Sequence, residues 1–347
     1  MHKKLFDNIC EIVKIYIKRL NAYFLIVYRK VGDFSRQKIT SWWQVIMLSL
    51  FGVVFLYYPI GGLMIHEIDT SFTYKPKVSD GRMGAIDVIS YLINREVHYK
   101  LWTPNLPFLF PSYFLDNMPS FQQGIMSAVA QSSKAIEAMS FVGNDKEAKA
   151  DIVEGVELLQ YPGNVWLFSP QNSLLPAPSS NTQYKKGRKK LNNFNRALAR
   201  GKIDVDRSSQ NLELALMMIK KDINKAVLST EKYVREKSGS FVDFGADEEF
   251  YFNKGKFYAY SQILKALGGD FKNVLIKYDV YQQWTSILKL LEQAAETNPL
   301  IIRNGDVASI IAPNHLLMLN YFASRAINRI NVVIDKLDKK TGEEDDY

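Results

Sequence analysis

Three side chains are suited to acid–base chemistry: the carboxylates of Asp116 and Glu249 and the imidazole of His315. A pair of carboxyl groups about 5–10 Å apart can hydrolyse a glycosidic bond, with one as acid and the other as nucleophile or base. A histidine adds a group that titrates near neutral pH. The sequence does not set the distances among these residues, so a cell-envelope hydrolase that uses them is an alternative function.

The same residues also suit structural roles, which we favour. Asp116 and Asn117 precede an expected helix and can cap it, although they are equally suited to binding a polar ligand. The acids 247–249 lie at the start of another helix, where negative charge complements the helix dipole. His315 follows an Ala-Pro-Asn turn that should open the last helix, where it would cap or pack.

Other reactive arrangements are missing from the sequence. The four histidines make no HExxH or other metal-ligand spacing, and no Gly-x-Ser-x-Gly turn occurs. Cys10 is the single cysteine, so the rest of the chain has no disulfide, cysteine nucleophile or thiolate metal site. We therefore expect no metal and no cofactor, and a protein that is not an enzyme.

Two segments rich in proline and aromatic residues, 102–119 and 161–178, interrupt the helical pattern. Loops of this length without regular structure are uncommon in compact domains and often bind partners. Proline fixes its own φ angle, so we expect both loops to be ordered and packed on the bundle. Alternatively, their aromatic rings plug one end of the core. The candidate partner-binding residues are Trp102, Phe108, Asp116, Asn117, Tyr161 and Trp166.

Apolar residues recur at helical spacing through the rest of the chain, whereas alternation with a period of two is scarce outside Val165–Phe168. The pattern predicts an all-α protein, a helical bundle behind one membrane helix. The expected helices are 80 to about 100, 118–139, 145–160, 179–200, 204–237, 247–268, 280–297 and 314–340.

Two of these helices, 204–237 and 314–340, carry an apolar seam with alternating spacings of three and four residues. Such a seam keeps one stripe facing a neighbouring helix. We favour packing within one bundle. The alternative is a seam that joins two chains into a homo-oligomer.

The run 39–65 contains no charged residue and predicts a transmembrane helix. At about 1.5 Å per residue it is longer than the roughly 30 Å hydrocarbon core of a bilayer. Aromatic pairs at its two ends, Trp42 with Trp43 and Tyr57 with Tyr58, match the interfacial belts of membrane proteins. Pro59 and the glycines after it are expected to break or kink the helix near its exit.

The basic arm 1–38 sets the expected orientation. It holds nine Lys or Arg against three acids, so the positive-inside rule places it in the cytoplasm, with an amphipathic helix over 5–28 on the inner leaflet or against a cytoplasmic partner. No signal-peptidase site follows the apolar run, so the anchor should stay uncleaved. Residues 66–340 would then form the exported domain and 341–347 an acidic disordered tail.

The net charge of +8 does not indicate nucleic-acid binding. Without the arm, 35 basic and 33 acidic residues are left, so the exported part is nearly neutral. The basic excess lies beside the membrane, where it attracts anionic lipid. One basic stretch, 185–202, reads as a solvated helix face, with lipid head groups or an acidic partner as the alternative.

The loop motifs resemble the bacterial family known as domain of unknown function 2333, from Tyr57 onward. The similar segments are Tyr58-Pro-Ile-Gly61, Trp102 to Phe108, Leu115 to Gly124, Tyr161 to Trp166, Ser179 to Tyr184, Asp247 to Tyr251 and Ala312 to Leu316. The resemblance implies a bacterial envelope protein with one N-terminal anchor. Together with the expected orientation, it places the anchor in the inner membrane and the exported domain in the periplasm. It implies no activity, so no catalytic residue can be carried over.

The leading hypothesis is therefore a non-enzymatic, membrane-anchored helical module that binds another envelope protein through its two loops. Its expected partners are the lipid bilayer and that envelope protein. A weaker reading is lipid binding in a groove between helices.

Overall fold

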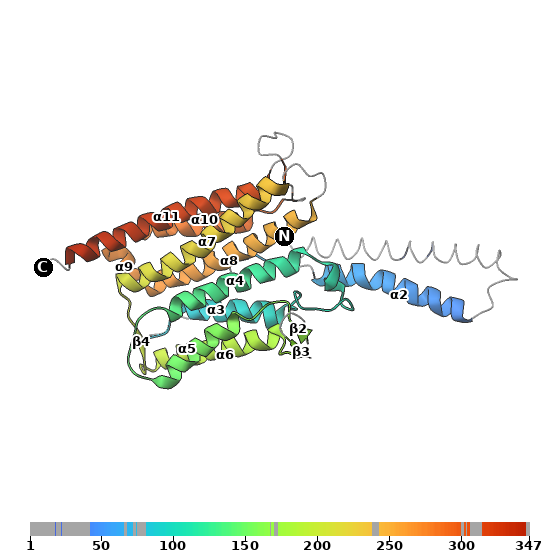
Figure 1. The fold of residues 1–347 in the computed structure, drawn as a ribbon, viewed down its shortest axis with the longest axis horizontal. Coiled ribbons are helices and arrows are strands. Elements are labelled where there is room, and N and C mark those ends of the chain that lie inside the picture. Colours follow the sequence, from blue (N-terminus) through green and yellow to red (C-terminus); the bar gives the residue numbers. More distant parts are fainter. Residues whose placement is uncertain are drawn as a thin grey trace. The chain divides into compact units, whose positions relative to one another are not determined.

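The computed structural model describes residues 18, 22, 42–65, 68–71, 74, 81–166, 168–169, 173–237, 243–299, 302, 304–305 and 314–344. The chain divides into two compact units, Met1–Tyr57 and Tyr58–Tyr347. The amphipathic helix expected in the arm lies outside the described residues, except for Lys18 and Ala22, which are helical. Figure 1 shows the order of the elements along the chain.

The apolar run forms α2 (Trp42–Ile65). Its segment Gln44–Leu63 has a mean hydropathy of 1.9 and is long and apolar enough to cross a membrane, alone among the described helices. Pro59 does not end this helix, which continues to Ile65, so the break expected there was wrong. A proline removes one hydrogen bond of the ladder, whereas a break in an apolar helix would leave several backbone groups unpaired.

The second unit is a helical bundle, which confirms the all-α prediction (Figure 1). Its helices are α3 (Gly84–Asn94), α4 (Asn117–Glu137), α5 (Lys146–Leu159), α6 (Ser180–Ala199), α7 (Ser209–Lys237), α8 (Phe244–Asp270), α9 (Lys272–Lys277), α10 (Tyr281–Glu296) and α11 (His315–Glu344). Helix α8 is central and contacts α3, α4, α10 and α11. Helices α5 and α6 pack on each other beyond α3 and α4.

The closest helix pair is α4 with α8, because two glycines let the backbones touch. A Cβ atom added at Gly124 would lie 1.9 Å from the carbonyl oxygen of Phe252. One added at Gly255 would lie 2.1 Å from the carbonyl oxygen of Phe121. No side chain fits at either position, so the sequence of both helices is constrained by this crossing.

The two predicted seams are buried within the chain. Leu212, Leu216 and Ile219 of α7 are at most 1% exposed, as are Leu316 and Leu319 of α11. Helix α11 packs against α7 and α10. The seams therefore pack inside one bundle, as favoured.

Several element boundaries differ from the prediction. Residues 204–205 form strand β4 (Asp204–Val205), paired with β1 (Phe141–Val142), so α7 begins only at Ser209. The second loop is not structureless, because β2 (Phe168–Ser169) and β3 (Ser173–Pro176) form a hairpin in it. Helix α9 was not predicted, and α11 continues past residue 340 to Glu344.

The first predicted helix is also shorter than expected. Helix α3 begins at Gly84 and passes into a π-helix, η1 (Arg95–Tyr99), after Asn94. A short 3₁₀ helix, η2 (Pro111–Phe114), lies within the first loop. Asp80, where this helix was expected to begin, lies outside the described residues. The position before α3 is held by Met83, which makes no side-chain capping hydrogen bond.

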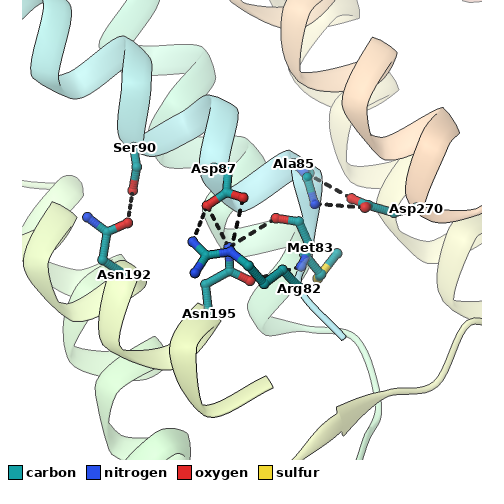
Figure 2. Close-up of polar contacts among 9 residues, drawn as sticks. Arg82, Met83, Ala85, Asp87, Ser90, Asn192, Asn195 and Asp270 are labelled. Carbon is teal, nitrogen blue, oxygen red and sulfur yellow. Dashed lines mark hydrogen bonds and ion pairs between the residues drawn. The ribbon is translucent and has the colours of Figure 1, made fainter. Parts of the chain in front are cut away.

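Neighbouring helices supply the missing cap (Figure 2). The Asp270 carboxylate of α8 accepts hydrogen bonds from the backbone nitrogens of Gly84, at 2.7 Å, and Ala85, at 2.9 Å. Asn195 of α6 accepts from the backbone nitrogen of Met83 at 2.9 Å. Burial raises the pKa of Asp270 to about 6. Helix α3 is thus fixed to both of its neighbours at its first turn.

Candidate functional site

The two proline and aromatic loops, far apart in sequence, are hydrogen-bonded to each other. The indole nitrogen of Trp102 donates to the carbonyl oxygen of Gly163 at 2.9 Å. The side-chain nitrogen of Asn105 donates to the carbonyl oxygen of Val165 at 2.8 Å and to Oδ1 of Asn181 at 2.7 Å. We call this arrangement of the loops 102–119 and 161–178 with the start of α6 the loop end.

The start of α6 fastens the second loop. The Ser180 hydroxyl donates to the carbonyl oxygen of Pro162 at 2.7 Å and accepts from the backbone nitrogen of Val165 at 3.0 Å. The Tyr184 hydroxyl donates to the carbonyl oxygen of Tyr161 at 2.8 Å. Burial raises the pKa of Tyr184, so this phenol stays protonated as a donor. The loop is therefore held in one conformation rather than draped over the bundle.

A buried polar cluster lies beneath the first loop. Nε of Arg95 donates to the Glu96 carboxylate at 2.6 Å, and Nε2 of Gln122 donates to its other oxygen at 3.2 Å. Gln122 in turn accepts from the backbone nitrogen of Thr103 at 2.9 Å. Glu96 and Gln122 are fully buried, and the Arg95 guanidinium lies over the ring of Tyr258. Arg95 and Glu96 lie in the π-helix η1, a deviation that often accompanies functional sites, and here the cluster supports the loop.

The predicted partner-binding residues divide into buried and exposed ones. Trp102 is fully buried and makes an edge contact with Tyr184, with ring centroids 5.3 Å apart. Tyr161 is half-buried against the core. By contrast Phe108 is 62% exposed and Trp166 is 42% exposed. The plug interpretation therefore fits Trp102, while Phe108 and Trp166 are free to meet something outside the domain.

A cleft of about 410 Å³ lies beside the second loop. One face of α4 forms its floor, and its walls come from the end of α5, the second loop, α7 and α8. The lining combines apolar residues and two charged ones, Lys134 and Asp222, with uncharged polar side chains such as Gln123, Gln131 and Gln160. Amide and hydroxyl groups can both donate and accept, so they suit the backbone of an extended polypeptide.

The three acid–base candidates lie on three different helices, at the start of α4, in α8 and at the start of α11. Asp116 is exposed and caps α4 by accepting from the backbone nitrogen of Asn117, as predicted. Glu249 accepts from the Thr230 hydroxyl at 2.6 Å. His315 is the first residue of α11, as predicted, where the side chain of the preceding asparagine makes the cap.

A different carboxyl group lies in the field of Asp116. Burial raises the pKa of Asp247, and the nearby charges of Asp116 and Asp243 add to this shift. Asn117, beside Asp116, has a buried side-chain oxygen with no hydrogen-bond partner within the described residues. Within the same part of the chain, no group of three or more His, Cys, Asp or Glu side chains is arranged for a metal ion.

Two of the eight basic residues in the stretch 185–202 form ion pairs with acids in or just before α5. Nζ of Lys190 lies 3.0 Å from the Asp151 carboxylate and 2.7 Å from that of Glu154. Lys202, just past α6, lies 3.3 Å from the Asp145 carboxylate. The stretch is therefore tied to α5 at Lys190 and beside its start at Lys202.

Reasoning from sequence missed the residues that connect the loops. Asn105, Gln122, Gly163 and Ser180 are small or uncharged and carry no reactive group. Each of the four lies within a different segment that resembles the family, and Asn105 lies between two prolines of its segment. Those motifs were the available signal, but they do not say which loop touches which.

Comparison with known proteins places part of the bundle in a family. Neither the curated proteins nor the solved structures include a match to this chain. Residues 203–338, from the end of α6 through most of α11, match the family described as an uncharacterized protein conserved in bacteria, DUF2333. Of the similar segments, 247–251 and 312–316 lie inside this match. The predicted resemblance to DUF2333 is thus confirmed for residues 203–338.

Proposed function

We propose that this protein is a single-pass inner-membrane protein whose periplasmic helical domain binds another envelope protein. The apolar segment Gln44–Leu63 supports the anchor, and the basic arm before it supports a cytoplasmic N-terminus. The family that matches residues 203–338 is conserved in bacteria, so the membrane would be a bacterial one. The domain itself carries the binding site, at its loop end.

The observation that carries this proposal is a rigid loop end with an exposed tryptophan. Trp166 is 42% exposed and follows Val165, whose backbone is fixed by Ser180 and Asn105. A pre-ordered surface loses little entropy on binding, and tryptophan is enriched among residues that dominate interfaces. Trp166 would anchor the partner, and the cleft beside Tyr161 would take an extended segment of it.

The other candidates have supporting parts in this proposal. Trp102 positions the second loop through its bond to Gly163 rather than touching the partner. Asp116 and Asn117 lie at the start of α4 and would contact the partner at the rim of the surface. Phe108 lies beside the end of α2, where its carbonyl oxygen accepts from the Tyr58 hydroxyl.

A photo-crosslinking amino acid at position 166 in the full-length protein tests this proposal in membranes. We expect a specific adduct with one envelope protein, which Trp102→Ala should weaken by releasing the loop. Tyr281, 55% exposed at the start of α10, is the matched control position. If positions 166 and 281 give the same adducts, or neither gives any, the binding proposal fails.

A cell-envelope hydrolase is the second candidate, favoured by one observation. Burial and the nearby charge of Asp116 raise the pKa of Asp247, and a pair of carboxyl groups of which one has a raised pKa is the usual arrangement for glycoside hydrolysis. Release of soluble fragments from cell-wall glycan by the purified protein, abolished by Asp247→Asn, would support this function. Absence of release, or release that Asp247→Asn leaves unchanged, would reject it.

A further inference from the structure

The tip of the first loop is an exposed apolar turn. Residues 106–111 read Leu-Pro-Phe-Leu-Phe-Pro, and no charged residue occurs between 101 and 115. At the tip, Phe108 is 62% exposed and Leu109 is 61% exposed. Adjacent large apolar side chains at such exposure mark a surface that contacts something apolar.

The turn is ordered, and its backbone is suited to a medium poor in water. The backbone nitrogen of Phe110 donates to the carbonyl oxygen of Pro107 at 2.9 Å. The Phe108 carbonyl oxygen accepts from the Tyr58 hydroxyl at 2.8 Å. Pro107 and Pro111 have no N–H group to leave unpaired. Few polar backbone groups would therefore lose water if the turn entered lipid, where unpaired groups are costly.

The same contacts set the level of the turn along α2. Tyr58 and Gly61 both lie inside the apolar segment Gln44–Leu63 and in the same compact unit as the loop. Pro111 packs on Gly61 so closely that a Cβ atom there would lie 2.4 Å from its ring. Tyr58 lies about 7 Å before Leu63 along the helix axis. The turn is thus beside the last turns of the membrane segment and not beyond them.

We propose that the turn 106–111, which we call the lipid tip, inserts Phe108 and Leu109 into the outer interfacial layer of the bilayer next to α2. The partner is phospholipid, because the tip has no charge or specific donor for a protein to recognise and is continuous with the membrane helix. This inference rests on the proposed membrane anchor. It also separates Phe108 from the protein-binding surface around Trp166.

Depth-dependent fluorescence quenching tests the lipid tip in the full-length protein. Cys10→Ser removes the native thiol, and Leu109→Cys is then labelled with a fluorophore whose emission depends on polarity. The protein is reconstituted in nanodiscs of phosphatidylethanolamine and phosphatidylglycerol, with and without lipids that carry a nitroxide quencher. We expect blue-shifted emission and strong quenching by nitroxides near the head groups.

Two matched positions make the outcomes distinguishable. Val142→Cys, 65% exposed on β1, reports the far end of the bundle, because its partner strand β4 lies opposite β2 and β3 in Figure 1. Val53→Cys, 64% exposed in α2, reports the anchor itself. Quenching at 53 and 109 but not at 142 supports the proposal. Quenching at 53 alone overturns the lipid tip and leaves the anchor standing, whereas no quenching at 53 overturns the anchor and with it this inference.

A charged residue next to the label adds a second readout. Phe108→Asp in the Leu109→Cys background should reduce the quenching at 109, since burying a carboxylate in the interface is unfavourable. Phe108 is mostly exposed, so the bundle should stay folded, which far-ultraviolet circular dichroism would verify. Unchanged quenching in this variant would mean that the side chain at 108 does not face lipid.

Discussion

At the crossing of α4 and α8, we predict that replacing a glycine by alanine destabilises the protein, although alanine has the higher helix propensity. In Gly255→Ala the new methyl group would lie 2.1 Å from the carbonyl oxygen of Phe121 and 2.9 Å from its carbonyl carbon. Both are backbone atoms of α4, so no side-chain rotation relieves the clash. The helices must separate by on the order of 1 Å, because carbon and oxygen normally stay beyond about 3 Å.

The magnitude follows from two opposing effects. Replacing glycine by alanine inside a helix stabilises by about 1 kcal/mol when the space is free. Forcing a methyl group into a close-packed contact costs about 1–3 kcal/mol, and more where the backbone itself must move. The separation also loosens the core around Phe121 and Phe250, both fully buried. We expect a net loss of about 2 kcal/mol or more in the free energy of unfolding.

Gly269, in the same helix, provides the matched control, because no atom lies within 4 Å of its added Cβ. Gly269→Ala should therefore stabilise the protein by about 0.5–1 kcal/mol. Urea unfolding of the full-length protein in detergent, followed by circular dichroism, measures both variants against wild type. If Gly255→Ala were as stable as wild type or more stable, the close approach of α4 and α8 would be refuted.

Three further predictions concern buried groups. The folded-state pKa of Asp270 is about 6, above the value of about 3.9 in unfolded chains, so ionisation is harder in the folded protein. The free energy of unfolding should therefore be highest below about pH 4 and fall by about 3 kcal/mol as the pH rises through 6. Asp270→Asn should remove this fall in a series of unfolding curves measured at different pH. Burial lowers the pKa of Lys254 to about 8, so stability should rise with pH above 8 until the unfolded-state lysine also loses its proton, and Lys254→Met should remove that rise. Trp102→Ala should cost about 3–5 kcal/mol, because the fully buried ring leaves a cavity and an unpaired Gly163 carbonyl. Trp166→Ala should change the free energy of unfolding by no more than about 0.5 kcal/mol, and similar losses for both variants in urea titrations would contradict the division between plug and exposed surface.

Helix positions were predictable wherever signals were local. Helix α5 was expected at 145–160 and spans Lys146–Leu159, because an apolar period of 3.6 residues follows a capping aspartate, Asp145. The end of α3 was not predictable. It passes into a π-helix at Arg95, where a buried guanidinium, Glu96 and the hydroxyl of Tyr258 must all be satisfied together.

The candidate site was predictable in its parts but not in its assembly. Proline and aromatic residues marked both loops, and Asp116 was recognised as a cap. The sequence did not predict that Trp102 is buried and Trp166 exposed, because both lie in segments rich in proline and aromatic residues. Burial depended on which carbonyl the indole could reach, namely that of Gly163 in the other loop.

The amino-acid sequence by itself determined the apolar segment long enough to cross a membrane, the helical class and the absence of disulfides outside the arm. These features follow from composition and from spacing within one or two helical turns. Only the tertiary structure decided three other features. The Asp270 carboxylate caps α3, the two proline and aromatic loops bind each other, and the turn around Phe108 lies against the last turns of α2. Those contacts join residues from about 50 to 190 positions apart, and no local pattern encodes the distance between them.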